Sequence, residues 1–267
     1  MKGHQARKRF GQNFLADPHY VKRIVDAVDP QPGDNLVEIG PGLAALTGDL
    51  IARAGRITAI EIDRDLAARL RAQFDPARLT LREADALEFD FTQLGPGLRV
   101  VGNLPYNISS PLLFHLAVHD AQLRDLHVML QREVVARMTA DPGTADYGRL
   151  TVMLQAKFRI VRLFVVPGGA FRPAPKVESA LARLLPLHED KPAIADEALF
   201  ARVVAAAFSQ RRKTLRNALA SLASASTLEA AGIDPGARGE TLAVADFVRL
   251  ANLLAGPQPT AATSAPR

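Results

Sequence analysis

The feature that most constrains the fold is a repeated alternation of short apolar runs and helical patterns, which begins at Asn35. Each apolar run has the length of a buried strand and leads through a turn into apolar residues at helical spacing. The expected strands span residues 36–39, 57–61, 79–81, 99–102 and 126–130. Strands that alternate with helices in this way predict a parallel sheet with helices on both faces, which is the doubly wound α/β class.

The composition changes after Pro186, where alanine-rich helical patterns take over at 197–208, 213–222 and 244–254. We therefore predict a doubly wound domain over 1–187 and a small all-α domain over 188–255. Residues 256–267 are rich in Pro, Ala and Thr, which predicts a disordered tail.

The composition also narrows the function. The chain has 267 residues and no cysteine, which excludes disulfides, thiolate metal sites and a cysteine nucleophile. Its first residues lack an apolar signal core and no run approaches the ~20 residues of a membrane span, so we expect a cytoplasmic protein without membrane contact. The net charge of +5 is compatible with a polyanionic partner, although solubility alone would also account for it.

A glycine-rich turn follows the first expected strand. The run Gly40-Pro41-Gly42-Leu43-Ala44-Ala45 has the spacing of a nucleotide-binding turn, and Glu61 stands about twenty positions later, where it would accept hydrogen bonds from ribose hydroxyls. Enzymes that use NAD and enzymes that use S-adenosylmethionine (SAM) share this pattern, and a purely structural turn is the alternative. Asp85, after the third strand, would receive an adenine amine and so favours a single nucleoside such as SAM, unless it is a solvated loop residue.

The fourth expected strand ends in Asn103-Leu104-Pro105-Tyr106. In open α/β sheets, ligands bind at such carboxyl ends. The Asn103 side chain offers a carbonyl acceptor, and Pro105 restricts Leu104 to an extended conformation that would aim its main-chain carbonyl at the same ligand group. Tyr106 offers a ring face for stacking. Together these residues suit a nucleobase held by its exocyclic amine, whereas the alternative is an ordinary turn after a strand.

Three further segments are candidates for contact with nucleic acid. Phe171 lies in a stiff Pro- and Gly-rich loop over 167–179 and would form the other face of a base-stacking slot, unless it fills the core beneath the loop. The N-terminal segment places Asn13 and Leu15 where they would fold over a ligand, or it is disordered. Two basic runs would grip a phosphate backbone, unless they are solvated surface; their members are Arg7, Lys8 and Arg9, and Arg211, Arg212, Lys213 and Arg216.

Five blocks in order give the chain a resemblance to the bacterial KsgA/RsmA family of small-subunit rRNA adenine dimethyltransferases, from Arg7 to about Leu254. The blocks are Phe10-Gly11-Gln12-Asn13-Phe14-Leu15, Glu38-Ile39-Gly40-Pro41-Gly42, Gly102-Asn103-Leu104-Pro105-Tyr106-Asn107-Ile108-Ser109, Phe171-Arg172-Pro173-Ala174-Pro175-Lys176-Val177 and Gln210-Arg211-Arg212-Lys213-Thr214. The resemblance implies that the SAM site is lined by Asn13, Leu15, Gly40, Glu61, Asp85 and Asn103. It also implies that Asn103, Leu104, Pro105 and Tyr106 receive the target adenine, with Phe171 beside it.

The family dimethylates N6 of two adjacent adenosines in a hairpin loop near the 3′ end of small-subunit rRNA, on an assembling particle, and the resemblance implies the same here. We expect direct attack of adenine N6 on the methyl donor, with no metal and no covalent enzyme intermediate, by a monomer. Three alternatives stay open: a large-subunit rRNA dimethyltransferase of the macrolide-resistance type, an assembly factor whose RNA binding matters more than catalysis, and an NAD-dependent oxidoreductase.

Overall fold

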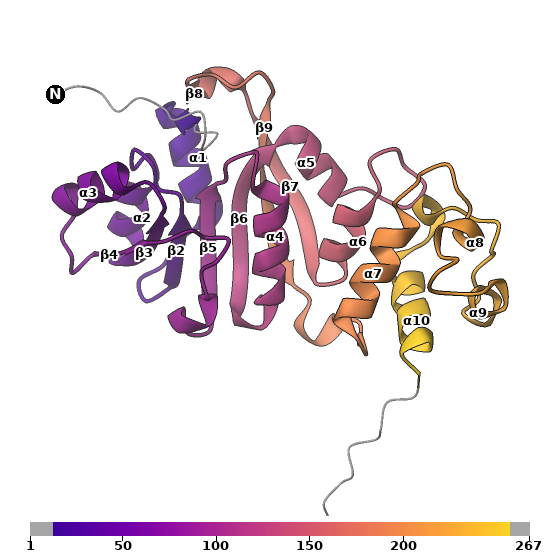
Figure 1. The fold of residues 1–267 in the computed structure, drawn as a ribbon. Helices are drawn as coiled ribbons and strands as arrows, with labels where there is room; N and C mark the ends of the chain where they lie inside the picture. The colour runs from indigo at the N-terminus through magenta and orange to yellow at the C-terminus, as the bar shows by residue number, and fades with distance from the viewer. Residues whose placement is uncertain (1–12, 257–267) are drawn as a thin grey trace, which may run out of the picture. The chain divides into compact units, whose positions relative to one another are not determined.

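The computed structural model describes residues 13–256, which form two compact units (Figure 1). The first unit contains the chain up to residue 139 and residues 157–189, and the second contains residues 140–156 and the chain from 190 onward. The sequence prediction assigned all of 1–187 to one domain, whereas the structure places 140–156 with the helical unit. Tyr147 and Val152 of this segment are buried in the core of that unit. No change in composition marks such an insertion between two strands of a sheet.

A seven-stranded sheet with the strand order β4-β3-β2-β5-β6-β9-β7 forms the first unit. Its strands are β2 (Asn35–Ile39), β3 (Ile57–Glu61), β4 (Leu79–Glu83), β5 (Leu98–Asn103), β6 (Leu123–Gln131), β7 (Phe158–Val166) and β9 (Ser179–Pro186). Neighbours from β4 to β6 pair in parallel, while β9 runs antiparallel to both β6 and β7. The predicted α/β class is confirmed, but the expectation of a parallel sheet fails at β9, because an apolar run carries no signal for its direction.

The helices of this unit begin where the sequence offers caps. The Asp17 carboxylate accepts a hydrogen bond from the His19 main-chain N–H, and Pro18 occupies the first helical position. Asp63 caps the helix after β3 in the same way. The helices are α1 (Pro18–Val28), α2 (Thr47–Ala54), α3 (Arg64–Gln73), α4 (Ser109–Val118) and α5 (Arg132–Met138), with 3-10 turns at Phe91–Leu94, Asp120–Gln122 and Gly168–Ala170. Apolar residues of α1, α2 and the central strands share one buried core.

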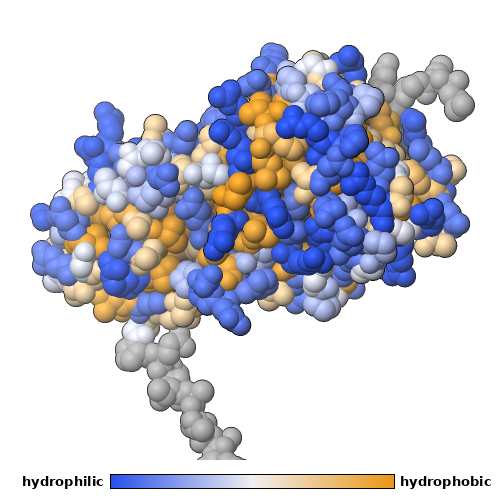
Figure 2. All heavy atoms as spheres, turned by 180° about the vertical axis from the view of Figure 1, so that it is seen from behind, coloured by the Kyte–Doolittle hydropathy of each residue, from blue (hydrophilic) through white to orange (hydrophobic). Residues whose placement is uncertain are grey.

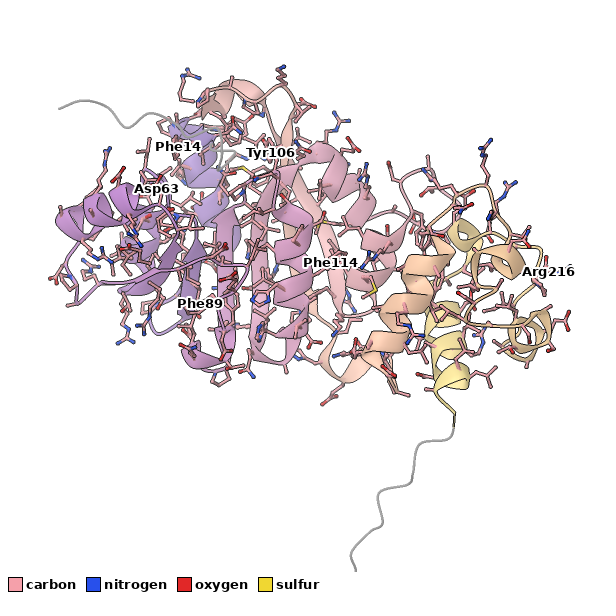
Figure 3. The ribbon with its side chains drawn as sticks, in the orientation of Figure 1. Phe14, Asp63, Phe89, Tyr106, Phe114 and Arg216 are labelled. Carbon is pink, nitrogen blue, oxygen red and sulfur yellow. The ribbon has the colours of Figure 1, made fainter. Side chains whose placement is uncertain are left out.

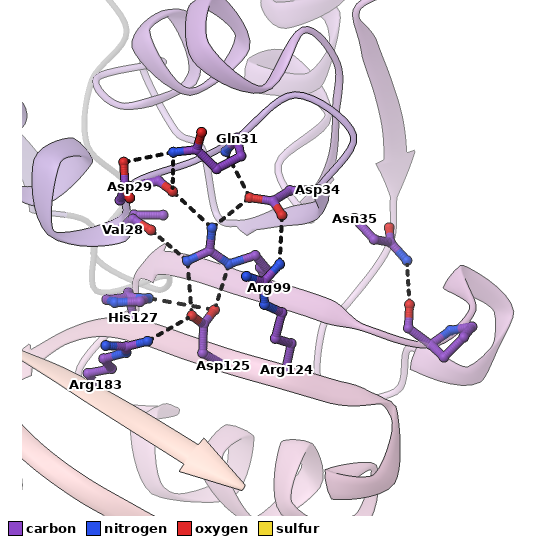
Figure 4. Close-up of polar contacts among 11 residues, drawn as sticks. Val28, Asp29, Gln31, Asp34, Asn35, Arg99, Arg124, Asp125, His127 and Arg183 are labelled. Carbon is purple, nitrogen blue, oxygen red and sulfur yellow. Dashed lines mark hydrogen bonds and ion pairs between the residues drawn. The ribbon is translucent and has the colours of Figure 1, made fainter.

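A buried arginine ties the C-terminal end of α1 to the sheet (Figure 4). Arg99 of β5 donates two hydrogen bonds to the Asp125 carboxylate, at 3.0 and 2.9 Å, and one to Asp34 at 2.6 Å. It also donates to the main-chain carbonyl oxygens of Val28 and Asp29. These are the last carbonyls of α1, which carry the negative end of the helix dipole and lack partners within the helix. All three charged side chains are almost completely buried, at 6%, 6% and 3% exposure for Arg99, Asp34 and Asp125.

The strand at one edge of the sheet, β7, exposes both apolar and charged side chains. Val161 and Leu163 are among the exposed large hydrophobic residues, and the arginines Arg159 and Arg162 are exposed between and beside them. Figure 2, which views the molecule from behind, shows apolar surface broken up by hydrophilic side chains. Charges on an edge strand discourage pairing with a second sheet.

The second unit is helical. Its helices are α6 (Arg149–Gln155), α7 (Glu197–Ala207), α8 (Leu215–Ala218), α9 (Ala225–Ala230) and α10 (Val244–Ala255), with a 3-10 turn at Gly239–Thr241. The 3-10 turn His188–Asp190 is the stretch where the chain passes from the first unit to the second. The helix predicted over 213–222 is only the four residues of α8. Ser224 then caps α9 by accepting from the Thr227 N–H, because serine competes well for main-chain groups at helix ends. The helices predicted at 197–208 and 244–254 match α7 and α10 closely.

Candidate active site

A cavity of about 280 Å³ opens at the carboxyl edge of the sheet, around the ends of β2, β3 and β5. Its lining comes from residues 13–15, 38–43 and 45–46, 60–62, 84–87 and 103–108. These segments are far apart in sequence and meet because the parallel strands all end at this edge. The site therefore lies where the glycine turn and the run after β5 were expected to act. The six residues predicted to hold the cofactor all line this one cavity: Asn13, Leu15, Gly40, Glu61, Asp85 and Asn103.

The glycine turn after β2 depends on backbone conformations that other residues rarely adopt. Gly40 and Gly42 have φ values of 67° and 58°. A Cβ atom on Gly42 would lie 3.0 Å from a carbon of the Phe14 ring, so this glycine is also needed for close approach. The Gly40 N–H donates to the Ile60 carbonyl at 2.9 Å, which fixes the turn against the end of β3.

Glu61 at the end of β3 is held before any ligand arrives. Its Oε2 accepts a hydrogen bond from the Gly42 N–H at 3.1 Å, and its Oε1 accepts from the Asp63 N–H at 2.9 Å. Burial raises the pKa of Glu61, and these two main-chain donors oppose the shift. A carboxylate has about four acceptor positions, so these main-chain donors leave room for a further donor such as a ligand hydroxyl.

Asp85 reaches the cavity from the turn after β4. Its Oδ1 accepts a hydrogen bond from the Leu87 N–H at 2.9 Å, which fixes the turn, and the side chain is half-buried. With Glu61, it places two carboxylates from neighbouring strands on the lining of the cavity. Such a pair suits a ligand that presents several hydrogen-bond donors.

Asn103, the last residue of β5, is oriented by the segment before α1. Its Nδ2 donates to the main-chain carbonyl oxygen of Asn13 at 2.8 Å. A carbonyl oxygen can only accept, so the amide must turn its NH₂ group toward Asn13 and present Oδ1 as an acceptor elsewhere. The two residues after Asn13 form β1 (Phe14–Leu15), which pairs antiparallel with β8 (Phe171–Arg172). This pairing holds the segment before α1 over the cavity.

The three residues after Asn103 form the rest of the turn. Leu104 is buried and its N–H donates to the Met129 carbonyl of β6 at 3.1 Å. Tyr106 is half-buried on the cavity lining, with its hydroxyl oxygen 2.6 Å from Oγ of Ser179 (Figure 3). Burial raises the pKa of Tyr106, so its hydroxyl is protonated at neutral pH.

A further carboxyl group on the cavity lining was not singled out from the sequence. Glu38 of β2 is 2% exposed and accepts a hydrogen bond from the Thr47 hydroxyl at 2.7 Å. Burial raises its pKa to about 7, Thr47 lowers it, and the nearby Glu61 raises it further. The signal that could have identified Glu38 is an acidic residue inside the apolar run of an expected strand.

The remaining predicted residues lie elsewhere. Phe171 is completely buried in the core of the first unit and, among the described residues, is not part of the cavity lining. Its pairing partner in β1, Leu15, does line the cavity. Arg7, Lys8 and Arg9 fall outside the described residues. The four basic residues predicted in the second unit are all exposed: Arg211, Arg212, Lys213 and Arg216. Figure 3 labels Arg216.

Within residues 13–256, no group of three His, Cys, Asp or Glu side chains is placed to hold a metal ion. Over the same residues, no helix is long and apolar enough to cross a bilayer.

Comparison with known proteins gives consistent matches. The family model described as "Ribosomal RNA adenine dimethylase" matches residues 3–256. The chain is 59% identical over 265 residues to "Ribosomal RNA small subunit methyltransferase A" of Aromatoleum aromaticum, covering 99% of this chain and 100% of that protein. It is 58% identical to the protein of the same name from Thiobacillus denitrificans, covering 94% and 99%.

Solved structures show the same fold. A dimethyladenosine transferase from Plasmodium falciparum superposes with a TM-score of 0.76 at 25% identity, covering 89% of this chain and 95% of that one. The 23S rRNA methyltransferase ErmE superposes with a TM-score of 0.66 at 27% identity, covering 91% and 100%.

Proposed function

This chain belongs to the ribosomal RNA adenine dimethylase family, and from that premise we propose that it dimethylates N6 of two adjacent adenosines in small-subunit rRNA with SAM as the methyl donor. The proposed target is a hairpin loop near the 3′ end of the RNA, where an unstacked base can enter the site without the opening of a duplex. The observation that carries the proposal is the orientation of Asn103. Its amide presents an acceptor on a cavity of about 280 Å³ that Glu61 and Asp85 also line.

The cavity residues fit SAM. Glu61, fixed by two main-chain donors, has acceptor positions for the ribose hydroxyls, and Asp85 has an oxygen for the adenine amine. Gly40 and Gly42 allow the main chain to approach the ligand closely, and Asn13 and Leu15 border it from the segment before α1. When bound, SAM supplies a methyl group on a positively charged sulfur. The neutral thioether that remains after transfer of the methyl group to an amine nitrogen is a good leaving group.

The residues after β5 prepare the target base. Asn103 Oδ1 and the Leu104 carbonyl accept hydrogen bonds from the exocyclic amine, which draws its lone pair out of conjugation with the ring. Tyr106 stacks on the base. Preorganised acceptors of this kind act without reorganisation during the reaction, so positioning and polarisation carry the catalysis. The role of Phe171 beside the base stays a prediction, since the side chain lies in the core.

Exposed cations of the second unit supply contact with the RNA backbone. Arg211, Arg212, Lys213 and Arg216 are exposed, and such a cluster binds phosphates without reading sequence. Arg7, Lys8 and Arg9 join them in this proposal. The partner is the assembling small subunit, and the enzyme acts in the cytoplasm as a monomer.

The large-subunit rRNA methyltransferase is the main rival, because ErmE shares the fold. The small-subunit assignment is favoured by relatives of that name which match almost the full chain at 54–59% identity. An NAD-dependent oxidoreductase is excluded by the family match over residues 3–256.

The decisive experiment offers radiolabelled SAM to unmethylated small subunits, to naked small-subunit rRNA and to large subunits in parallel, and then maps the labelled nucleotides. We expect label in two adjacent adenosines of the small subunit. Label confined to large-subunit RNA, or none on N6 of adenine, would contradict the proposal.

The proposal includes a role in small-subunit biogenesis. Cells that carry an Asn103 variant which still binds SAM and RNA separate this role from catalysis. If RNA binding matters more than methylation, such cells will mature their small subunits at the rate of the wild type, whereas cells without the protein will not.

A further inference from the structure

Ser179 reaches the active site because β9 runs against its neighbours. It is the first residue of β9 and pairs with Gln131, the last residue of β6. An antiparallel strand begins at the edge where the parallel strands end, so the start of β9 lies beside the turn after β5. The Ser179 side chain is completely buried and, within the described chain, is not part of the cavity lining.

The Ser179 hydroxyl contacts Tyr106, 73 positions earlier in the chain. The two side-chain oxygens lie 2.6 Å apart, a short distance for a hydrogen bond between hydroxyls. A tyrosine ring is oriented by two side-chain torsions, and a bond at its far end restrains both of them. Water cannot easily replace this bond, because Ser179 is shielded from solvent.

The main chain beneath Tyr106 is fixed separately. The Ser109 hydroxyl donates to the Pro105 carbonyl at 3.0 Å, and the Ile108 N–H donates to the same oxygen at 3.2 Å. The turn therefore keeps its shape without help from Ser179. What Ser179 adds is control over the direction of the ring.

We propose that Ser179 is a positioning residue, whose hydroxyl holds the Tyr106 ring in the orientation that stacks on the target adenine while Ser179 itself touches neither base nor cofactor. This inference rests on the proposed function. A ring held in advance loses less freedom when the base enters, so the contact lowers the barrier to productive base binding.

The test is a double-mutant cycle with Ser179→Ala, Tyr106→Phe and the double variant. Tyr106→Phe is the matched change, because it removes the same hydrogen bond from the other side and keeps the ring. We expect each single variant to lower single-turnover methylation of unmethylated small subunits by about 3- to 10-fold, the range for one hydrogen bond. The double variant should be no slower than the slower single variant, because the bond can be lost only once.

Two measurements separate positioning from general damage. The dissociation constant for SAM and the thermal unfolding midpoint should stay close to the wild-type values in all three variants. Target RNA with 2-aminopurine at the methylated position should show weaker fluorescence quenching with Ser179→Ala than with the wild type, since quenching reports base stacking.

The outcomes divide clearly. The role of Ser179 would be overturned if the rate losses of the two single variants multiplied in the double variant, or if Ser179→Ala methylated slowly while Tyr106→Phe kept the wild-type rate. Either outcome would leave the proposed function intact. Losses in SAM binding and thermal stability that match the losses in rate would also overturn it. A wild-type protein that methylates no RNA would overturn the proposed function and this inference together.

Discussion

The Nδ2 atom of Asn103 lies 2.8 Å from the main-chain carbonyl oxygen of Asn13, 90 positions earlier in the chain. This one contact joins the end of the central strand β5 to the segment that precedes α1. It also settles which way the amide faces, because the carbonyl of Asn13 requires a donor. The acceptor on which the proposed chemistry depends is thus oriented by a main-chain group that no side-chain substitution removes.

Replacing Asn103 with alanine should lower the methylation rate by about 10²–10³, as does loss of one preorganised polar contact in other enzymes. RNA binding should be retained, because the residues proposed to contact phosphates lie elsewhere. Single-turnover transfer from radiolabelled SAM measures the rate. Asn103→Asp keeps an acceptor but cannot donate to Asn13, so its rate should fall between those of the wild type and the alanine variant. An alanine variant with more than about a tenth of the wild-type rate would rule out this role.

Replacing Glu61 with glutamine should weaken SAM binding by about 10- to 100-fold, the range for a lost hydrogen bond to a charged group. The amide nitrogen of glutamine would face an N–H donor at Gly42 or Asp63, so the held geometry is lost along with the charge. Calorimetric titration measures the affinity directly.

The matched control is Glu83→Gln. Glu83 of β4 lies opposite Glu61 in the strand register, but its side chain is exposed and accepts a hydrogen bond from Arg71. The affinity of the Glu83→Gln variant for SAM should stay within about 2-fold of the wild-type value. Equal losses in the two variants would show that general charge, and not contact, governs binding.

Much of the candidate site could be predicted from the sequence because parallel strands end at one edge. Gly40, Glu61, Asp85 and Asn103 each follow or end an apolar run, so the alternation alone brings them together. The structure places all four on one cavity. Their roles as ligand-binding residues stay predictions.

Contacts that depend on strand direction or on long sequence separation were beyond prediction. The apolar run of β9 gave no sign that it runs antiparallel, so the meeting of Ser179 with Tyr106 was hidden. Arg99 looked like one polar residue in a strand, because its partners Asp34 and Asp125 lie 65 and 26 positions away. For Phe171 the sequence left two positions open, a base-stacking slot or the core beneath the loop, and the structure places the side chain in the core, while its role beside the base stays a prediction.

Replacing Arg99 with methionine should lower the free energy of unfolding by about 3–5 kcal/mol, because Asp34 and Asp125 would stay buried after losing their one buried cation and keep only the more exposed Arg124 and Arg183 as partners. Urea unfolding followed by circular dichroism measures the change. Arg124→Met is the control, since Arg124 pairs with the same Asp34 but is 61% exposed, and its loss should change stability by less than about 1 kcal/mol. Similar changes in both variants would mean that burial of the Arg99 network contributes nothing.

Burial raises the pKa of the Glu38 carboxyl group to about 7 from an ordinary 4.5. Between these values the folded protein holds a proton that the unfolded chain has released. The contribution of Glu38 to stability is therefore full below about pH 4.5 and is lost as the pH rises toward 7. Glu38→Gln cannot titrate, so its stability relative to the wild type should increase with pH by roughly 3 kcal/mol across this range.

The comparison must be made as a difference between the two proteins, because His127 titrates in the opposite sense. Burial lowers the pKa of His127 to about 4, so the unfolded chain binds a proton that the folded protein does not, and stability is lost as the pH falls from about 6.5 to 4. The two slopes largely cancel in the wild type. His127 is present in both proteins, so subtracting their unfolding free energies at each pH removes its contribution and isolates that of Glu38. A difference that stays constant from pH 4.5 to 7 would show that Glu38 is ionised in the folded protein throughout.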